Sequence, residues 1–140
     1  MMRLVVDTNI IVSGTLWSGA PSRLLDAVKR GSVALYSSPR LLEELGDVLF
    51  RPKFSGLFAG AGTSPDEVFR AFLDKCILVD AKKLARALAP DPDDDWVIAT
   101  ALAANADFIV TGDKPLLGVG KVGPIRIVSV AEALDLMGVG

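Results

Sequence analysis

The acidic residues are the side chains of this sequence best suited to chemistry. The chain contains no histidine and a single cysteine, Cys76. This composition excludes Ser–His and Cys–His triads, a histidine general base and typical zinc sites, so catalysis must rest on carboxylates, hydroxyls, lysines and arginines. The acids whose positions suggest a shared site are Asp7, Glu44, Asp94 or Asp95, and Asp113.

The segment DPDDD, residues 91–95, places four carboxylates directly before the apolar run WVIATALAANADFIV. We expect Asp91 to cap a helix and Pro92 to take its first position, with acids of the first turn satisfying free N–H groups and the helix dipole. Capping does not require Asp94 and Asp95 as well, and no lysine or arginine lies near them in the sequence. We therefore predict that one of these two acids belongs to a functional site.

Two adjacent glutamates differ in the direction they are expected to face. The segment LLEELGDVL has the apolar spacing of a helix, whose leucine stripe centres near Leu45. At about 100° per residue, Glu43 lies roughly opposite the stripe and Glu44 lies on its border. We expect Glu43 to face solvent and Glu44 to reach inward.

Several carboxylates in one crevice need a counter-charge. Two like charges about 4 Å apart repel by roughly 4 kcal/mol at an effective dielectric constant of about 20, so the acids would raise their pKa values or spread apart. A divalent cation relieves this repulsion, and an all-oxygen ligand set selects Mg²⁺ or Mn²⁺ before Zn²⁺. Such an ion would let the site bind a phosphodiester although the chain has a net charge of −2.

Alternating strands and helices must position these acids. In the first half of the chain, the apolar patterns predict a strand at 3–6, a helix from 22, a strand at 32–37, a helix from Ser38–Pro39 and a loop-like glycine-rich insertion at 55–65. In the second half they predict a helix from 64, a strand at 76–80, a helix at 96–104, strands at 107–111 and 125–129, and a closing helix. This order predicts an α/β fold with a mainly parallel sheet, a three-layer α/β/α sandwich. Ligands bind at the carboxyl ends of such strands, where Asp7 and Asp113 lie.

The chain is expected to form one domain. Its 140 residues, 51% of them hydrophobic, suit a single compact unit, and the apolar runs are too short for a membrane span. The absence of a basic, leucine-rich leader predicts a cytoplasmic protein.

The segments VVDTNIIVSG, LLEELGDVL and DPDDDWVIATALAANADFIVTGD, followed by PLL and IRIVS, resemble the PIN domain, in particular the VapC-like toxin nucleases. The resemblance runs from Arg3 to about Leu136, which makes residues 1–140 a single PIN-like nuclease domain. It implies a Mg²⁺- or Mn²⁺-dependent ribonuclease acting on single-stranded RNA. It also implies a homodimer whose activity is held in check by a cognate antitoxin.

The same resemblance assigns roles to particular residues. It implies that Asp7, Glu44 and Asp113 are catalytic metal ligands, and that the remaining ligand is Asp94 or Asp95. Thr111 matches the hydroxyl position before the last acid. Thr8 and Asn9 complete the DTN motif that follows the first strand.

Alternative functions remain open. A haloacid-dehalogenase-like phosphatase would need an acid two residues after Asp7, where this chain has Asn9. A catalytically quiet, antitoxin-binding PIN module would use the acids only as helix caps.

Some further residues have expected roles of their own. Trp17 and Trp96 are predicted to be packing residues and Cys76 a buried small hydrophobe. Arg51 and Lys53 are expected to be solvated surface charges, and contact with an RNA backbone is the alternative, because they follow the helix that carries Glu44. Leu16, Trp17 and residues 134–140 are candidates for a dimer face.

Overall fold

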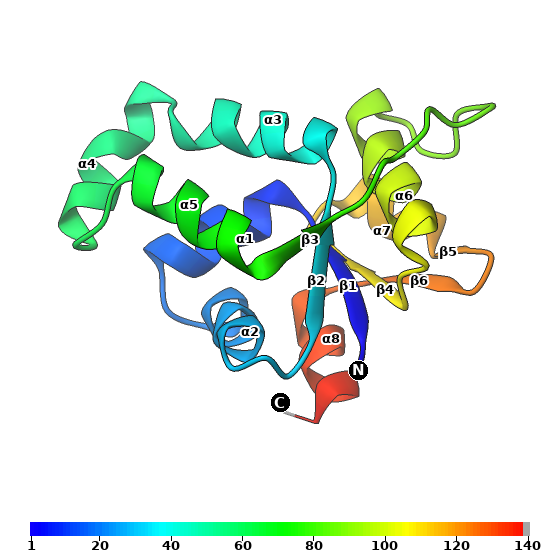
Figure 1. Ribbon diagram of the computed structural model, residues 1–140. Coiled ribbons are helices and arrows are strands. Elements are labelled where there is room, and N and C mark those ends of the chain that lie inside the picture. The colour runs from blue at the N-terminus through cyan, green and yellow to red at the C-terminus, as the bar shows by residue number, and fades with distance from the viewer. Residues whose placement is uncertain (139–140) are drawn as a thin grey trace.

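A six-stranded sheet forms the centre of the molecule (Figure 1). The computed structural model describes residues 1–138. The strands lie in the order β3-β2-β1-β4-β6-β5. β5 runs antiparallel to β6 and the other pairings are parallel. The strand bounds are Arg3–Val6 for β1, Ala34–Ser37 for β2, Cys76–Leu78 for β3, Phe108–Val110 for β4, Lys121–Val122 for β5 and Ile125–Val128 for β6.

Helices cover both faces of this sheet (Figure 1). One core packs α1, α2 and α8 on one face, and a second core packs α6 and α7 on the other. This arrangement confirms the predicted three-layer sandwich. The helix bounds are Thr8–Leu16 for α1, Ala20–Lys29 for α2, Pro39–Leu49 for α3, Pro52–Gly60 for α4, Pro65–Lys75 for α5, Pro92–Ala104 for α6, Lys114–Val119 for α7 and Val130–Met137 for α8. Within the described residues, no helix is both long and apolar enough to cross a bilayer.

β1 and β4 are neighbours at the centre of the sheet. Val6 of β1 pairs with Val110 of β4. The chain runs outward from β1 through β2 to β3, then returns to the other side of β1 as β4. This change of direction makes a crevice at the carboxyl ends of β1 and β4, where α/β proteins bind ligands. Asp7 and Thr111 are the residues that follow the two strands.

α3 begins where β2 ends and runs along the top of the view toward α4, above α1 and α5 (Figure 1). Leu41, near its start, packs in the core beside α6. Leu45, one turn later, packs in the core beside α1. The side chain between these two anchors, Glu44, is therefore held over the crevice.

The helix starts follow the predicted capping chemistry. Ser38 and Ser64 accept hydrogen bonds from the backbone N–H groups of Leu41 and Glu67 at distances of 3.4 and 3.2 Å. Asp91 caps α6 by accepting from the N–H of Asp93 at 2.9 Å. Side-chain oxygens at these positions satisfy N–H groups that have no partner within the helix.

The predicted loop at residues 55–65 is wrong, because α4 occupies most of it. Phe58 of this helix is fully buried, and Phe54, one turn earlier, lies edge-on to it with ring centroids 6.2 Å apart. The burial of this pair outweighs the poor helix propensity of the neighbouring glycines. Sequence patterns also missed α1, α7 and β5.

The expected packing role of Trp17 is wrong as well. Its side chain lies at the end of α1 and is 54% exposed. Trp96 and Cys76 are partly buried against the two cores. This agrees with the packing role predicted for Trp96, whereas Cys76 is less buried than predicted.

Candidate active site

One buried hydroxyl joins the ends of β1 and β4. Thr111 donates a hydrogen bond of 2.7 Å to Asp7 Oδ2. Its hydroxyl oxygen accepts a hydrogen bond of 3.0 Å from the backbone N–H of Asp113. Thr111 is fully buried and Asp7 is 7% exposed. The strand ends thus hold one carboxylate and fix the backbone from which the second projects.

The Asp7 carboxyl has a raised pKa, chiefly because it is buried. The hydrogen bond from Thr111 and the nearby backbone of Thr8 and Asn9 act in the opposite direction, and the charge of Asp113 raises the pKa further. Thr8 is buried and Asn9 is exposed. These two residues of the DTN motif therefore act on Asp7 through their main chain.

Asp113 and Asp94 bring their carboxyl groups together across the crevice. Asp113 caps α7, and its Oδ2 accepts from the N–H of Leu116 at 3.1 Å. Asp94, in the first turn of α6, has a pKa raised to about 7 by burial first, then by the charge of Asp113 and a hydrogen bond between the two side chains, and then by Asp7 and Asp91.

Glu44 reaches the same crevice from α3. It is half-buried while Glu43 is exposed, which confirms the predicted orientation of the two. Burial raises the pKa of Glu44 to about 7, and the charges of Asp7, Asp93 and Asp91 add to this effect, with Arg40 opposing them. We call Asp7, Glu44, Asp94 and Asp113 the acid cluster.

A chain of hydroxyls fixes α3 against α6. The Oγ atoms of Ser38 and Thr100 lie 2.8 Å apart, and the Thr100 hydroxyl donates to the carbonyl of Trp96 at 2.8 Å. Because Thr100 has one hydroxyl proton, Ser38 must be the donor of the first bond. Both residues are fully buried. The helices that carry Glu44 and Asp94 are therefore held in a fixed relation.

Asp95 is engaged away from the acid cluster. Its Oδ1 accepts hydrogen bonds from the backbone N–H groups of Leu88 and Ala89, at 2.9 and 2.8 Å. These bonds hold the segment that leads into α6. The four acids of residues 91–95 thus have separate surroundings: Asp91 caps the helix, Asp93 lies near Arg40, Asp94 joins the cluster and Asp95 binds the preceding backbone.

The chemistry of the acid cluster fits a hard divalent cation. Its donors are all carboxylate oxygens, the ligands of Mg²⁺ and Mn²⁺. Burial and mutual repulsion raise the pKa values of Asp7, Glu44 and Asp94, and positive charge would reverse this effect. In the arrangement described for residues 1–138, no three such side chains are close enough to hold one ion. Binding would therefore require side-chain rotation, for which the long side chain of Glu44 is best suited.

Comparison with known proteins shows the family of the chain. A family model for the PIN domain matches residues 3–115. The chain belongs to the PIN domain family. Proteins of this family are generally nucleases, which hydrolyse phosphodiester bonds. A curated relative, an uncharacterised protein of Methanocaldococcus jannaschii named MJ1680, is 27% identical over 117 residues, which cover 83% of this chain and 74% of the relative.

Solved structures share the same fold. PAE2754 from Pyrobaculum aerophilum superposes with a TM-score of 0.63 at 16% identity, covering 99% of this chain and 91% of that one. VapBC2 from Rickettsia felis, solved bound to a DNA fragment from its promoter, gives a TM-score of 0.62 at 16% identity, covering 91% and 98%. FitAcB from Neisseria gonorrhoeae gives 0.52 at 17% identity, covering 91% and 98%.

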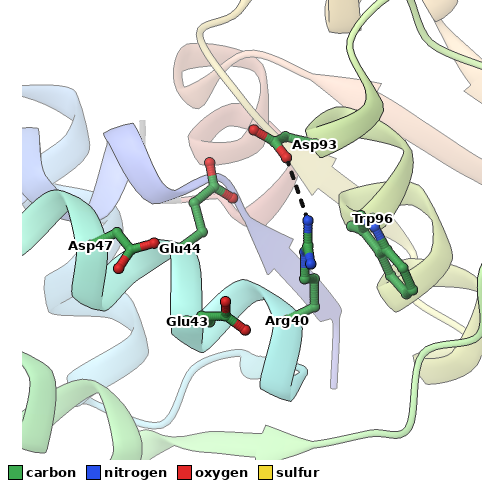
Figure 2. A pocket seen from close by; sticks show the side chains of 6 residues that line it. All are labelled: Arg40, Glu43, Glu44, Asp47, Asp93 and Trp96. Atoms are coloured by element: carbon green, nitrogen blue, oxygen red, sulfur yellow. Dashed lines mark ion pairs between the residues drawn. The ribbon is translucent and has the colours of Figure 1, made fainter.

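This PIN domain has a small cavity beside the acid cluster (Figure 2). The cavity has a volume of about 100 Å³ and is lined by Arg40, Glu43, Glu44, Asp47, Asp93 and Trp96. Arg40 lies between Asp93, at 3.9 Å, and the ring of Trp96, whose centroid is 5.5 Å from the guanidinium carbon. Sequence reasoning missed Arg40, because its partners come from a helix more than fifty residues away in the chain.

Proposed function

We propose that this PIN domain is a metal-dependent endoribonuclease that cleaves phosphodiester bonds of single-stranded RNA, as the toxin of a toxin–antitoxin module. The observation that carries the proposal is the crevice in which Thr111 holds Asp7 while Asp94 meets Asp113. Burial raises the pKa values of three of the four carboxylates, Asp7, Glu44 and Asp94, and such a set suits a cation and its phosphate ligand better than it suits a structural core.

Each residue of the acid cluster has a distinct task in the proposed reaction. Mg²⁺ or Mn²⁺, when bound, would supply the positive charge and Lewis acidity that phosphodiester hydrolysis requires. Asp7 and Asp113 would be its main ligands, since the strand ends and Thr111 already fix them. Thr111 keeps the Asp7 carboxylate oriented, as hydrogen-bonding neighbours of ligands do. Glu44 would complete the site from α3.

We assign the remaining ligand to Asp94 rather than Asp95. The carboxyl of Asp94 interacts with Asp113 and Asp7, whereas one oxygen of Asp95 already accepts two backbone hydrogen bonds. Moving Asp95 into the crevice would leave the N–H groups of Leu88 and Ala89 without that acceptor, at a cost of about 1–3 kcal/mol each.

The proposed partners are a cognate antitoxin and a second copy of the chain. VapBC2 and FitAcB, which share the fold, support the antitoxin. For the homodimer, Trp17 is 54% exposed and Leu136 is 36% exposed, which leaves apolar surface near the expected face. Residues 139 and 140 of that face lie outside the described residues. We place the proposed activity in the cytoplasm, because that is where its RNA substrate would be found.

Two alternatives are less well supported. In a phosphatase of the haloacid-dehalogenase type, Asn9 would have to act as general acid, and an amide cannot give up a proton in this way. A binding module that uses its acids only as helix caps does not account for Glu44, since this residue caps no helix and has a pKa raised by burial and then by its acidic neighbours.

Cleavage of a fluorescent single-stranded RNA tests the proposal. We expect cleavage with Mg²⁺ or Mn²⁺, none with EDTA, and no hydrolysis of p-nitrophenyl phosphate. Calorimetry with Mn²⁺ alone gives an independent readout, with weak binding expected because such ions keep several waters until substrate arrives. Hydrolysis of the phosphate monoester with no cut in RNA would favour the phosphatase.

A further inference from the structure

The cavity beside the acid cluster is lined by an arginine, an indole ring and several carboxylates. Arg40 lies against the ring of Trp96, with the guanidinium carbon 5.5 Å from the ring centroid. Four carboxylates, from Glu43, Glu44, Asp47 and Asp93, form the rest of its lining. In the close-up view these side chains come from α3, along its length from Arg40 to Asp47, and from the start of α6 (Figure 2).

Stability does not account for the position of Arg40. Its ion pair with Asp93 is long, at 3.9 Å, and both side chains are more than half exposed. Exposed pairs of this kind contribute little to folding. The Ser38–Thr100–Trp96 hydrogen bonds already join the two helices. Arg40 and the exposed part of Trp96 therefore remain available to a ligand.

The shape and charge of the cavity favour a nucleobase over a phosphate. Four carboxylates repel a phosphate, but they can accept hydrogen bonds from the exocyclic amino group of a base. Flat guanidinium and indole groups stack on base faces. At about 100 Å³ the cavity holds the equivalent of about three waters, so it can receive the edge of a ring but not a whole nucleotide.

We propose that Arg40, Trp96 and the surrounding carboxylates form a nucleobase subsite, which takes an amino-bearing base next to the scissile phosphate. Cytosine offers its N4 amino group as a donor to these acids, whereas uracil presents a carbonyl oxygen that they repel. This specificity rests on the proposed function, because Glu44 belongs both to the acid cluster and to the cavity. The subsite selects which bonds of a single-stranded RNA are cut.

Tryptophan fluorescence can test the subsite without cleavage. In a Trp17→Phe, Asp7→Asn background, Trp96 is the remaining tryptophan and the RNA stays intact. We titrate oligo(C) and oligo(U) RNA in Mg²⁺, following Trp96 emission and the anisotropy of labelled RNA. Oligo(C) should quench the emission and bind about tenfold more tightly than oligo(U).

Variants of the two cavity residues provide the matched controls. Arg40→Gln should weaken oligo(C) binding about tenfold, Arg40→Lys should weaken it less, and Arg23→Gln, an exposed arginine on α2, should have no effect. With Asp7 restored, Arg40→Gln and Trp96→Phe should raise KM for a cytosine-containing RNA more than they lower kcat. Melting curves identify any variant that fails to fold.

The outcomes separate this proposal from the proposed function. Equal binding of oligo(C) and oligo(U), or RNA binding with unchanged Trp96 emission, overturns the subsite even if the protein cuts RNA. Quenching by oligo(C) that depends on Arg40 supports the subsite, and it does so even if no metal-dependent cleavage is found, in which case only the nuclease proposal fails.

Discussion

Thr111 donates a hydrogen bond of 2.7 Å to Asp7 Oδ2, although 104 residues separate them in the chain. The same hydroxyl accepts the N–H of Asp113 at 3.0 Å. One buried side chain therefore connects two acids of the cluster, and it uses both its donor and its acceptor to do so. We therefore expect the activity of the site to depend on the hydroxyl group of Thr111 more than on its methyl group.

The first prediction concerns that hydroxyl. Thr111→Val should lower RNA cleavage about 10–100-fold, because Asp7 loses its orienting donor and its pKa rises further. The N–H of Asp113 also loses its acceptor, which lowers the melting temperature. Thr111→Ser is the matched control and should keep most of the activity. A valine variant with parental rates would show that this hydrogen bond has no catalytic role.

The second prediction distinguishes Asp94 from Asp95. Asp94→Asn removes a charge from a repelling group, so the variant should be at least as stable as the parent but should cut RNA orders of magnitude more slowly. Asp95→Ala should do the reverse: two backbone N–H groups lose their acceptor, which costs about 1–3 kcal/mol each, while folded molecules keep their activity. Chemical denaturation and cleavage rates measured on both variants provide the comparison. The opposite pattern would make Asp95 the ligand.

The free energy of unfolding should fall as the pH rises from the ordinary pKa values of Glu44 and Asp94 to their raised values of about 7. The pKa of Glu44 is raised from 4.5 to about 7, and that of Asp94 from 3.8 to about 7. Between the ordinary and the raised values the folded state binds more protons than the unfolded state, so the free energy of unfolding decreases with pH. The groups that face them, Asp7, Asp113 and the acids at the start of α6, are negatively charged and strengthen the effect, whereas Arg40 weakens it for Glu44.

Melting temperatures across this range, measured without divalent metal, check the sign. Glu44→Gln and Asp94→Asn should each flatten the decline. Added Mn²⁺ should raise the melting temperature more at about pH 8 than at about pH 5, since it binds the ionised acids. A melting temperature that rises steadily from about pH 4 to about pH 7 in the parent would contradict the raised pKa values.

Several helix starts and strand ends could be predicted from the sequence, because short local patterns determine them. Ser38, Ser64 and Asp91 lie before prolines that open helices, and these short patterns need no tertiary information. The apolar runs that form β1 and β4 end in polar residues at the same edge of a parallel sheet, so their proximity follows from topology. The orientation of Glu44 followed from helical periodicity alone.

Other features depend on contacts between distant segments, and sequence alone did not reveal them. Asp94 and Asp95 are adjacent acids in one helical turn, and what distinguishes them is the backbone of Leu88 and Ala89, which reaches only Asp95. α4 contains glycines that favour a loop, yet burial of Phe58 stabilises it as a helix.

Replacing either of two helical glycines with alanine should change the stability of the protein, in opposite directions. A Cβ atom at Gly14 would lie 2.6 Å from Leu25 Cδ1 and 2.8 Å from the Pro21 carbonyl oxygen, so Gly14→Ala should destabilise the protein by about 1–3 kcal/mol. At Gly56, within α4, a Cβ atom would meet nothing within 4 Å. Gly56→Ala should stabilise the protein by about 0.5–1 kcal/mol if this segment is helical. A destabilised Gly56→Ala variant would argue against α4.

The most direct test of the acid cluster is the rate at which Asp7→Asn cleaves a fluorescent single-stranded RNA in Mg²⁺ or Mn²⁺. The substitution keeps the shape of the side chain and an acceptor for Thr111, so the variant should fold and melt no lower than the parent. Its cleavage rate should fall by orders of magnitude. Asp91→Asn is the matched control, and it should cut at nearly the parental rate, since asparagine caps a helix about as well as aspartate. If Asp7→Asn cuts RNA as fast as the parent, the acid cluster is not the nuclease site.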